Sequence, residues 1–114
     1  MGGFDPAHSF LTKGDKRRSQ RVLLVIPLEI IWTTSQGVRG QESAATEVIG
    51  AYGALVRLKT RLPLGTEVQL RRAQIPEATS ARVTYHGPAG PDGLVRLGLE
   101  LTVPSEQFWG VKIP

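Results

Sequence analysis

The stretch VLLVIPLEIIW, residues 22–32, is the longest apolar run in the chain and decides its fold class. Alternate positions of the run are all large and apolar, and a repeat of two residues indicates an extended strand with one face in a core. The residues of this face are Val22, Leu24, Ile26, Leu28, Ile30 and Trp32. Pro27 has no backbone N–H to donate to a ladder, so we expect a bend, a bulge or an edge position there. The run is too short to span a bilayer and contains Glu29, which argues against a membrane helix.

Beyond this run the two-residue repeat returns in five more segments, each bounded by residues that favour turns. We expect strands at residues 43–49, 54–59, 67–71, 82–86 and 95–102. The linking segments 35–40, 62–65 and 87–93 are rich in turn-forming residues, chiefly Gly, Pro and Ser. In the last of these, Asp92 supplies a side-chain acceptor and Gly93 tolerates a positive φ, so this segment predicts a tight turn.

The end of the chain predicts a short helical turn. Ser105 follows Pro104 and is placed to cap such a turn, with Glu106 near its positive end. We expect Phe108 and Trp109 to pack on one side of the sheet as part of the core, and not to form a platform for a ligand.

Six short antiparallel strands without a long helix favour a closed barrel, because closure removes exposed strand edges. We therefore predict an all-β fold, a small six-stranded antiparallel β-barrel with a short C-terminal helical turn. The barrel is expected to occupy residues 16–114, after a flexible polar leader of residues 1–15.

The amino-acid composition excludes several classes of functional site. A chain of 114 residues is expected to form one domain with a single core. It has no cysteine, which excludes disulfides, thiolate zinc sites and thiol nucleophiles. His8 and His86 are the only histidines and no Ser, His and carboxylate group together locally, so we expect neither a metal site nor an enzyme. The sequence has no GxxxxGK phosphate loop, which also argues against an enzyme. It has no recognisable export signal, which favours a cytoplasmic protein.

Positive charge gathers in front of the first strand. The chain carries 14 Lys and Arg against 10 Asp and Glu, a net charge of +4, and the first 21 residues hold five basic and two acidic side chains. Such a local cluster suits a small anion or a short phosphate contact, whereas a nucleic-acid domain spreads basic residues over a whole face. A solvated basic tail is the simplest alternative. The aromatic content of 6% offers little for base stacking and argues against a nucleic-acid partner.

Three arginines, Arg17, Arg18 and Arg21, stand directly before the first strand. Arg17 and Arg21 are four residues apart, and this spacing at this position resembles the RxxxR signature of the PilZ domain, the bacterial receptor module for cyclic di-GMP. The resemblance covers residues 16–114 and includes the segment LGLEL, residues 97–101, which is similar to the last barrel strand of the family. It implies a receptor in bacterial second-messenger signalling, whose leader closes over the nucleotide against the barrel.

By this resemblance, Arg17 and Arg21 hold a guanine edge and the phosphates, and Arg18 assists. Arginine suits these tasks because one guanidinium donates two parallel hydrogen bonds to guanine O6 and N7 or to phosphate oxygens, and it also stacks on a base. Cyclic di-GMP is then the ligand, and no other cofactor is implied.

The second signature of the family, [D/N]xSxxG, corresponds to residues 48–53. Gly50 and Gly53 complete the expected ligand-binding set, but only Gly53 matches: Val48 replaces an acidic or amide residue and Gly50 replaces serine. The two missing polar groups would weaken binding by roughly a hundredfold. Glu47 is no simple substitute, because alternation of strand side chains predicts that it points away from the face of Val48, unless a bulge changes the alternation. A structural role with positive φ in a tight turn is the alternative for both glycines.

Two other functions remain open. A degenerate PilZ-like domain, binding the nucleotide weakly or not at all, would dock a protein partner through the barrel surface. An unrelated small barrel that binds nucleic acid would show strong salt dependence.

Overall fold

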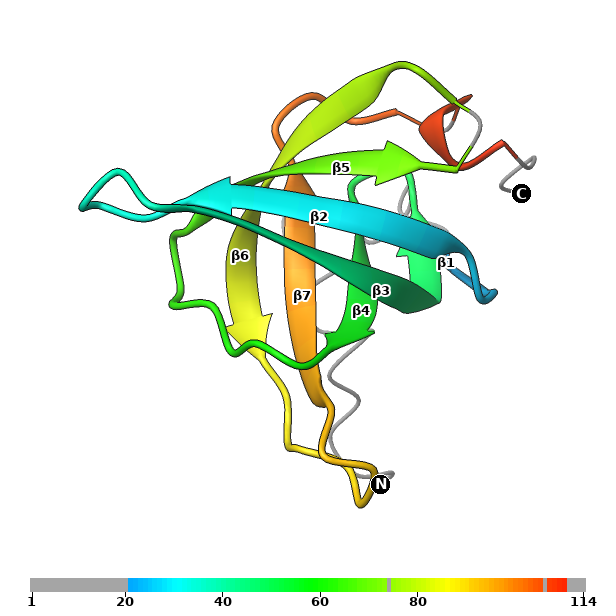
Figure 1. The fold of residues 1–114 in the computed structure, drawn as a ribbon. Helices are drawn as coiled ribbons and strands as arrows, with labels where there is room; N and C mark the ends of the chain where they lie inside the picture. Colours follow the sequence, from blue (N-terminus) through cyan, green and yellow to red (C-terminus); the bar gives the residue numbers. More distant parts are fainter. Residues whose placement is uncertain (1–20, 74, 106, 111–114) are drawn as a thin grey trace.

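The computed structural model describes residues 21–73, 75–105 and 107–110, and Figure 1 shows how they are arranged. These residues form seven β-strands and one 3₁₀ turn. The elements are β1 (Arg21–Leu23), β2 (Pro27–Thr33), β3 (Arg39–Gly50), β4 (Gly53–Leu58), β5 (Glu67–Arg72), β6 (Ala78–His86), β7 (Val95–Leu101) and η1 (Gln107–Trp109). No helix in the described ranges is long and apolar enough to cross a membrane.

Six of the strands close into an antiparallel barrel. Their hydrogen-bonded order is β3-β2-β5-β6-β7-β4, and β4 pairs back with β3 (Figure 1). The seventh strand, β1, pairs with the last three residues of β3. The predicted all-β, six-stranded antiparallel barrel with a C-terminal helical turn is confirmed.

The core fills the inside of the barrel with the faces that the two-residue repeat predicted. All six alternating residues of the 22–32 run contact it, three of them buried and three at its margin. Val56, Leu70 and Leu97 are also completely buried and come from β4, β5 and β7. Apolar burial from every strand of the barrel therefore stabilises one contiguous core.

The predicted bend at Pro27 is confirmed, and the structure shows what fills it. The chain leaves its ladder after Leu23 and re-enters it at Pro27, which begins β2. Thr46 of β3 lies opposite the gap, where its hydroxyl accepts a hydrogen bond from the Ile26 N–H at 2.8 Å and donates one to the Leu24 carbonyl at 2.6 Å. A buried side chain thus replaces the backbone hydrogen bonds lost at the bend.

Two strands extend further than the repeat predicted. β3 begins at Arg39 and β6 at Ala78, about four residues earlier than expected in each case. The added residues are polar or small and only half of them are solvent-exposed, so no repeat of large apolar residues marks them; pairing with β2 and β5 makes them strands. As a result the β2–β3 hairpin projects beyond the barrel (Figure 1).

Polar side chains join the two strands of this hairpin on its outer surface. The Glu29 carboxylate accepts hydrogen bonds from Gln41 Nε2 and Ser43 Oγ, both at 2.8 Å. The bond from Gln41, followed by that from Ser43, lowers the pKa of Glu29 below its ordinary value.

The turn at residues 91–93 has the predicted chemistry. Gly93 has a φ of +81°, and Asp92 Oδ1 accepts a hydrogen bond from the Leu94 N–H at 3.1 Å. That bond is the main cause of a lowered pKa for Asp92.

The C-terminal turn also follows the prediction. Ser105 Oγ accepts a hydrogen bond from the Phe108 N–H at 3.2 Å, as a cap does. Phe108 and Trp109 pack edge to face with ring centroids 5.0 Å apart, and Trp109 is fully buried in the core. Glu106, which was predicted to lie near the start of this turn, is outside the described residues.

Candidate ligand-binding face

An apolar row crosses five strands on the outside of the barrel. Directly opposed residues of antiparallel strands carry their side chains on the same side of the sheet. The register therefore places in one row Leu23 (β1), Val48 (β3), Leu55 (β4), Gly98 (β7) and Tyr85 (β6). Val48, Leu55 and Tyr85 form an apolar cluster separate from the core, and Leu23 at the end of the row is 84% exposed. We call these five residues the apolar row.

A second row runs parallel to the apolar row along one of its sides. Its members, again direct cross-strand partners, are Arg21, Gly50, Gly53, Glu100, Arg82 and Glu67. Arg21 lies directly opposite Gly50, so the last arginine of the first predicted motif meets the second predicted motif across the β1–β3 ladder. We call this set the glycine row, because Gly50 and Gly53 leave no side chain between Arg21 and Glu100.

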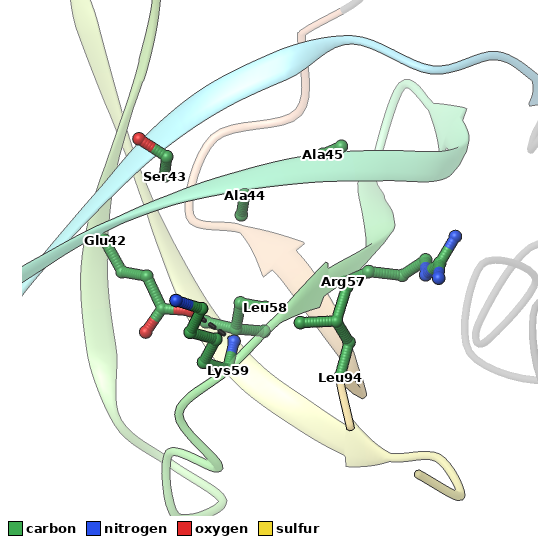
Figure 2. Close-up of a pocket in the computed structure, with 8 residues that line it drawn as sticks. All are labelled: Glu42, Ser43, Ala44, Ala45, Arg57, Leu58, Lys59 and Leu94. Atoms are coloured by element: carbon green, nitrogen blue, oxygen red, sulfur yellow. Dashed lines mark hydrogen bonds between the residues drawn. The ribbon is translucent and has the colours of Figure 1, made fainter. Parts of the chain in front are cut away.

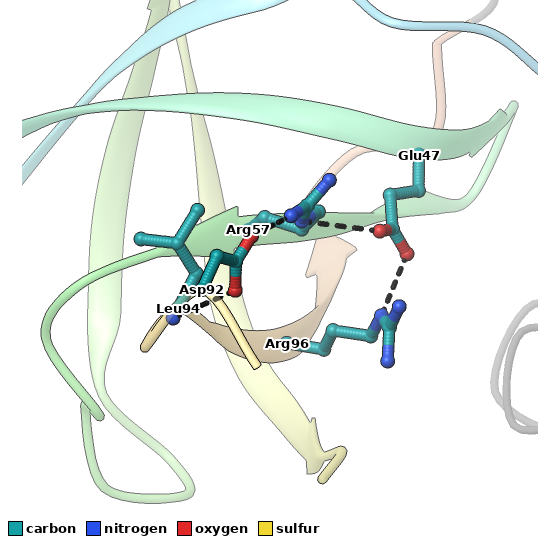
Figure 3. A network of polar contacts seen from close by, with 5 residues as sticks. All are labelled: Glu47, Arg57, Asp92, Leu94 and Arg96. Atoms are coloured by element: carbon teal, nitrogen blue, oxygen red, sulfur yellow. Dashed lines mark hydrogen bonds and ion pairs between the residues drawn. The ribbon is translucent and has the colours of Figure 1, made fainter. Parts of the chain in front are cut away.

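An ion-pair cluster borders the other side of the apolar row (Figure 3). Arg57 of β4 and Arg96 of β7 are direct cross-strand partners. Glu47 Oε2 lies 3.3 Å from Arg57 Nε, and Glu47 Oε1 lies 2.9 Å from Arg96 Nε. Arg57 also pairs with Asp92. We call Glu47, Arg57, Arg96 and Asp92 the ion-pair cluster.

The prediction that Glu47 points away from the face of Val48 is wrong, because β3 contains a bulge at this place. The register with β4 shifts between Thr46 and Val48, so Glu47 is an extra residue without a partner on that strand. Thr46 points into the barrel and Val48 outward, and Glu47 bonds to Arg57 on the outer side. A bulge puts two successive side chains on one face, and alternation resumes after it.

A hollow lies where β3 and β4 separate beyond the bulge (Figure 2). Arg57, Leu58 and Lys59 line one wall and Ala44 and Ala45 the other. The Glu42 carboxylate closes the end of the hollow by accepting hydrogen bonds from the backbone N–H groups of Lys59 and Thr60. Arg57 therefore stands between this hollow and the apolar row.

Gly50 and Gly53 have structural roles, but not the one that was considered. Neither has a positive φ, so the alternative of a positive-φ turn at these residues is wrong. At Gly53 a Cβ would overlap the carbonyl oxygen of Leu99, so β4 and β7 approach closely only because this residue is glycine. The carbonyl of Gly50 accepts a hydrogen bond from Trp109 Nε1 at 2.8 Å, which ties the second motif to the core.

The predicted site residues are only partly brought together. Arg21 and Gly50 are direct partners, and Gly53 is opposite Gly50 in the next strand. Arg17 and Arg18 lie outside the described residues, as does the whole predicted leader.

Five residues of this face carry no motif and were not singled out from the sequence. Leu55 and Arg57, and likewise Arg96 and Gly98, occupy the outward positions of strands that were predicted correctly. The alternation within each strand showed that these positions face outward. It did not show that β4 and β7 are paired side by side. Tyr85 reaches the row through a second bulge, between Val83 and the tyrosine, which no repeat reveals.

His86 has a defined place at the end of β6. Its Nε2 lies 2.7 Å from the Leu62 carbonyl oxygen, and its Nδ1 lies 3.3 Å from Arg61 Nη2. The ring is half-buried, because it bridges the end of β6 to the segment that follows β4.

Comparison with protein-family models and with curated proteins finds no match for this chain.

Proposed function

We propose that this chain is a receptor domain that binds cyclic di-GMP on the face formed by the apolar row and the glycine row. The observation that supports this most directly is the pairing of Arg21 with Gly50, which joins the two sequence motifs at one edge of the face. Two stretches separated by nearly thirty residues thus lie side by side, which supports treating them as parts of one site.

The face offers the contacts that a nucleotide needs. The Arg21 guanidinium can donate two parallel hydrogen bonds to a guanine edge or to phosphate oxygens. Tyr85 is half-buried and supplies apolar area for a base, while Leu55, against which it packs, is only 4% exposed. Gly98, the partner of Tyr85 on β7, adds no side chain above the strand. In this proposal Arg17 and Arg18 complete the set of guanidinium groups.

Val48 limits the affinity that we expect for cyclic di-GMP. It lies in the apolar row and is 4% exposed, so it contributes packing with Leu55 but no hydrogen bond to a base. We therefore expect the domain to bind cyclic di-GMP more weakly than one with an acidic or amide residue at this position.

Isothermal titration of cyclic di-GMP tests the proposal. The wild-type protein is expected to release heat, and Arg21→Ala is expected to lose about tenfold or more in affinity. Arg39→Ala is the matched control, because it removes the same charge from the exposed start of β3. No heat from the wild type at about 100 µM ligand, or equal losses in both variants, would contradict the proposal.

Docking of a protein partner is the second candidate function, and one observation favours it. Leu23 and Val25 are 84% and 70% exposed, and exposed aliphatic side chains near the apolar row suit a protein interface. This function predicts that Leu23→Ser with Val25→Ser abolishes partner binding, while Arg17→Ala with Arg21→Ala leaves it intact. The nucleotide receptor predicts that the arginine variant is the one that loses cyclic di-GMP.

A further inference from the structure

The ion-pair cluster contains two arginines in an unusual relation. Arg57 and Arg96 are direct cross-strand partners on the outside of the barrel, and like charges in such positions repel. Their side chains are 39% and 37% exposed, so water screens them only in part. An anion close to both guanidinium groups therefore stabilises the pair.

Glu47 supplies that anion in the way that a bound phosphate would. Its two carboxylate oxygens are divided between the arginines, one on Arg57 Nε and the other on Arg96 Nε (Figure 3). The bulge in β3 is what brings this carboxylate to the outer face. Among the described residues, the two terminal amino groups of Arg96 make no hydrogen bond, so donors remain for a larger anion.

Arg57 and Arg96 lie directly beside the apolar row. Leu55 precedes Arg57 by two residues on the same face of β4, and Gly98 follows Arg96 by two on β7. A ligand that packs on Tyr85, the half-buried partner of Gly98 on β6, can thus place an anionic group at the two arginines. Arg21 stands on the opposite side of the apolar row, so the row has guanidinium groups along both sides.

We propose that Arg57 and Arg96 form an anion-binding subsite for a phosphate group of the ligand, and that Glu47 is an internal competitor which the phosphate displaces. The step is an exchange of one anion for another, so the arginines stay neutralised throughout. As a subsite for that ligand it rests on the proposed function, although the anion-binding property itself is testable without cyclic di-GMP.

The experiment uses inorganic pyrophosphate as the probe and the full chain as the protein. The Nε–Hε signals of Arg57 and Arg96 are followed by NMR during the titration, and the dissociation constant is compared between variants. Glu47→Gln is expected to bind pyrophosphate about fivefold more tightly, and Arg96→Gln about tenfold more weakly.

Glu77→Gln is the matched control. It adds the same charge to the protein by neutralising an exposed carboxylate just before β6, outside both rows and the ion-pair cluster. We expect it to change the affinity for pyrophosphate by less than twofold, because water and salt screen an exposed charge.

Repeating the titrations with cyclic di-GMP separates this inference from the proposed function. If cyclic di-GMP does not bind but pyrophosphate shifts both arginine signals, the proposed function fails and the anion site stands. If cyclic di-GMP binds with equal affinity to the wild type, Glu47→Gln and Arg96→Gln, the receptor stands and the subsite is overturned. Unmoved Nε–Hε signals with pyrophosphate in the wild type and in Glu47→Gln also overturn it, whether or not a variant loses stability.

Discussion

Replacing Thr46 with valine tests how the barrel tolerates its bend. Valine has nearly the same volume as threonine, so the change creates no cavity and removes only the hydroxyl. The Ile26 N–H and the Leu24 carbonyl then lose their side-chain partner. An unpaired buried backbone group costs about 1–3 kcal/mol, and the Leu24 carbonyl is partly accessible to water, so we expect Thr46→Val to lower the free energy of unfolding by about 2–4 kcal/mol. For a domain of this size that corresponds to a fall in Tm of about 10–25 °C.

Urea unfolding followed by Trp109 fluorescence measures the effect, since this indole is fully buried in the folded protein. Thr84→Val is the matched control, because the Thr84 hydroxyl lies 3.5 Å from the Gly98 carbonyl oxygen, at the limit of a hydrogen bond. We expect the control to lose less than about 1 kcal/mol. Equal losses in the two variants, or a loss below about 0.5 kcal/mol in Thr46→Val, would refute the assigned role of Thr46.

Three other changes test separate parts of the structure. Gly53→Ala is expected to destabilise the protein by about 1–3 kcal/mol or to prevent folding, because its Cβ overlaps the backbone of β7; a stability equal to the wild type by thermal unfolding would contradict the close approach. Glu29→Gln is expected to lower stability at neutral pH, and the difference from the wild type is expected to disappear as the pH falls through the lowered pKa of Glu29, below its ordinary value of 4.5, because the hydrogen-bonded carboxylate is lost when it protonates. A difference between the two proteins that is independent of pH would contradict the hydrogen-bonded carboxylate. Val48→Asp combined with Gly50→Ser is expected to tighten cyclic di-GMP binding about tenfold or more by calorimetry, and unchanged affinity would count against the proposed register of the second motif.

The barrel could be predicted from the sequence because its inner face obeys a simple repeat. Ile26, Leu28 and Ile30 alternate without interruption, and burial follows directly from that alternation. The turn at Asp92 and Gly93 was equally predictable, because its conformation depends on those residues alone. Both features depend on residues that are neighbours in the sequence, and for this reason the sequence alone predicts them.

The candidate face was less predictable because it depends on register. One extra residue at Glu47 reverses the alternation after it, and a bulge leaves no mark in an apolar repeat. The partnership of Arg57 with Arg96 likewise follows from the pairing of β4 with β7, strands more than thirty residues apart in the chain. Only the three-dimensional pairing shows that these residues and Arg21 border the same apolar row.

Mapping cyclic di-GMP onto the barrel by backbone amide chemical shifts tests the central claim most directly. Binding at the proposed face predicts that the largest shifts fall on Arg21, Leu55, Tyr85 and Gly98, while the hairpin around Gly37 stays unchanged. Shifts confined to the hairpin, or no shifts at saturating ligand, would contradict the claim that this outer face is the nucleotide site.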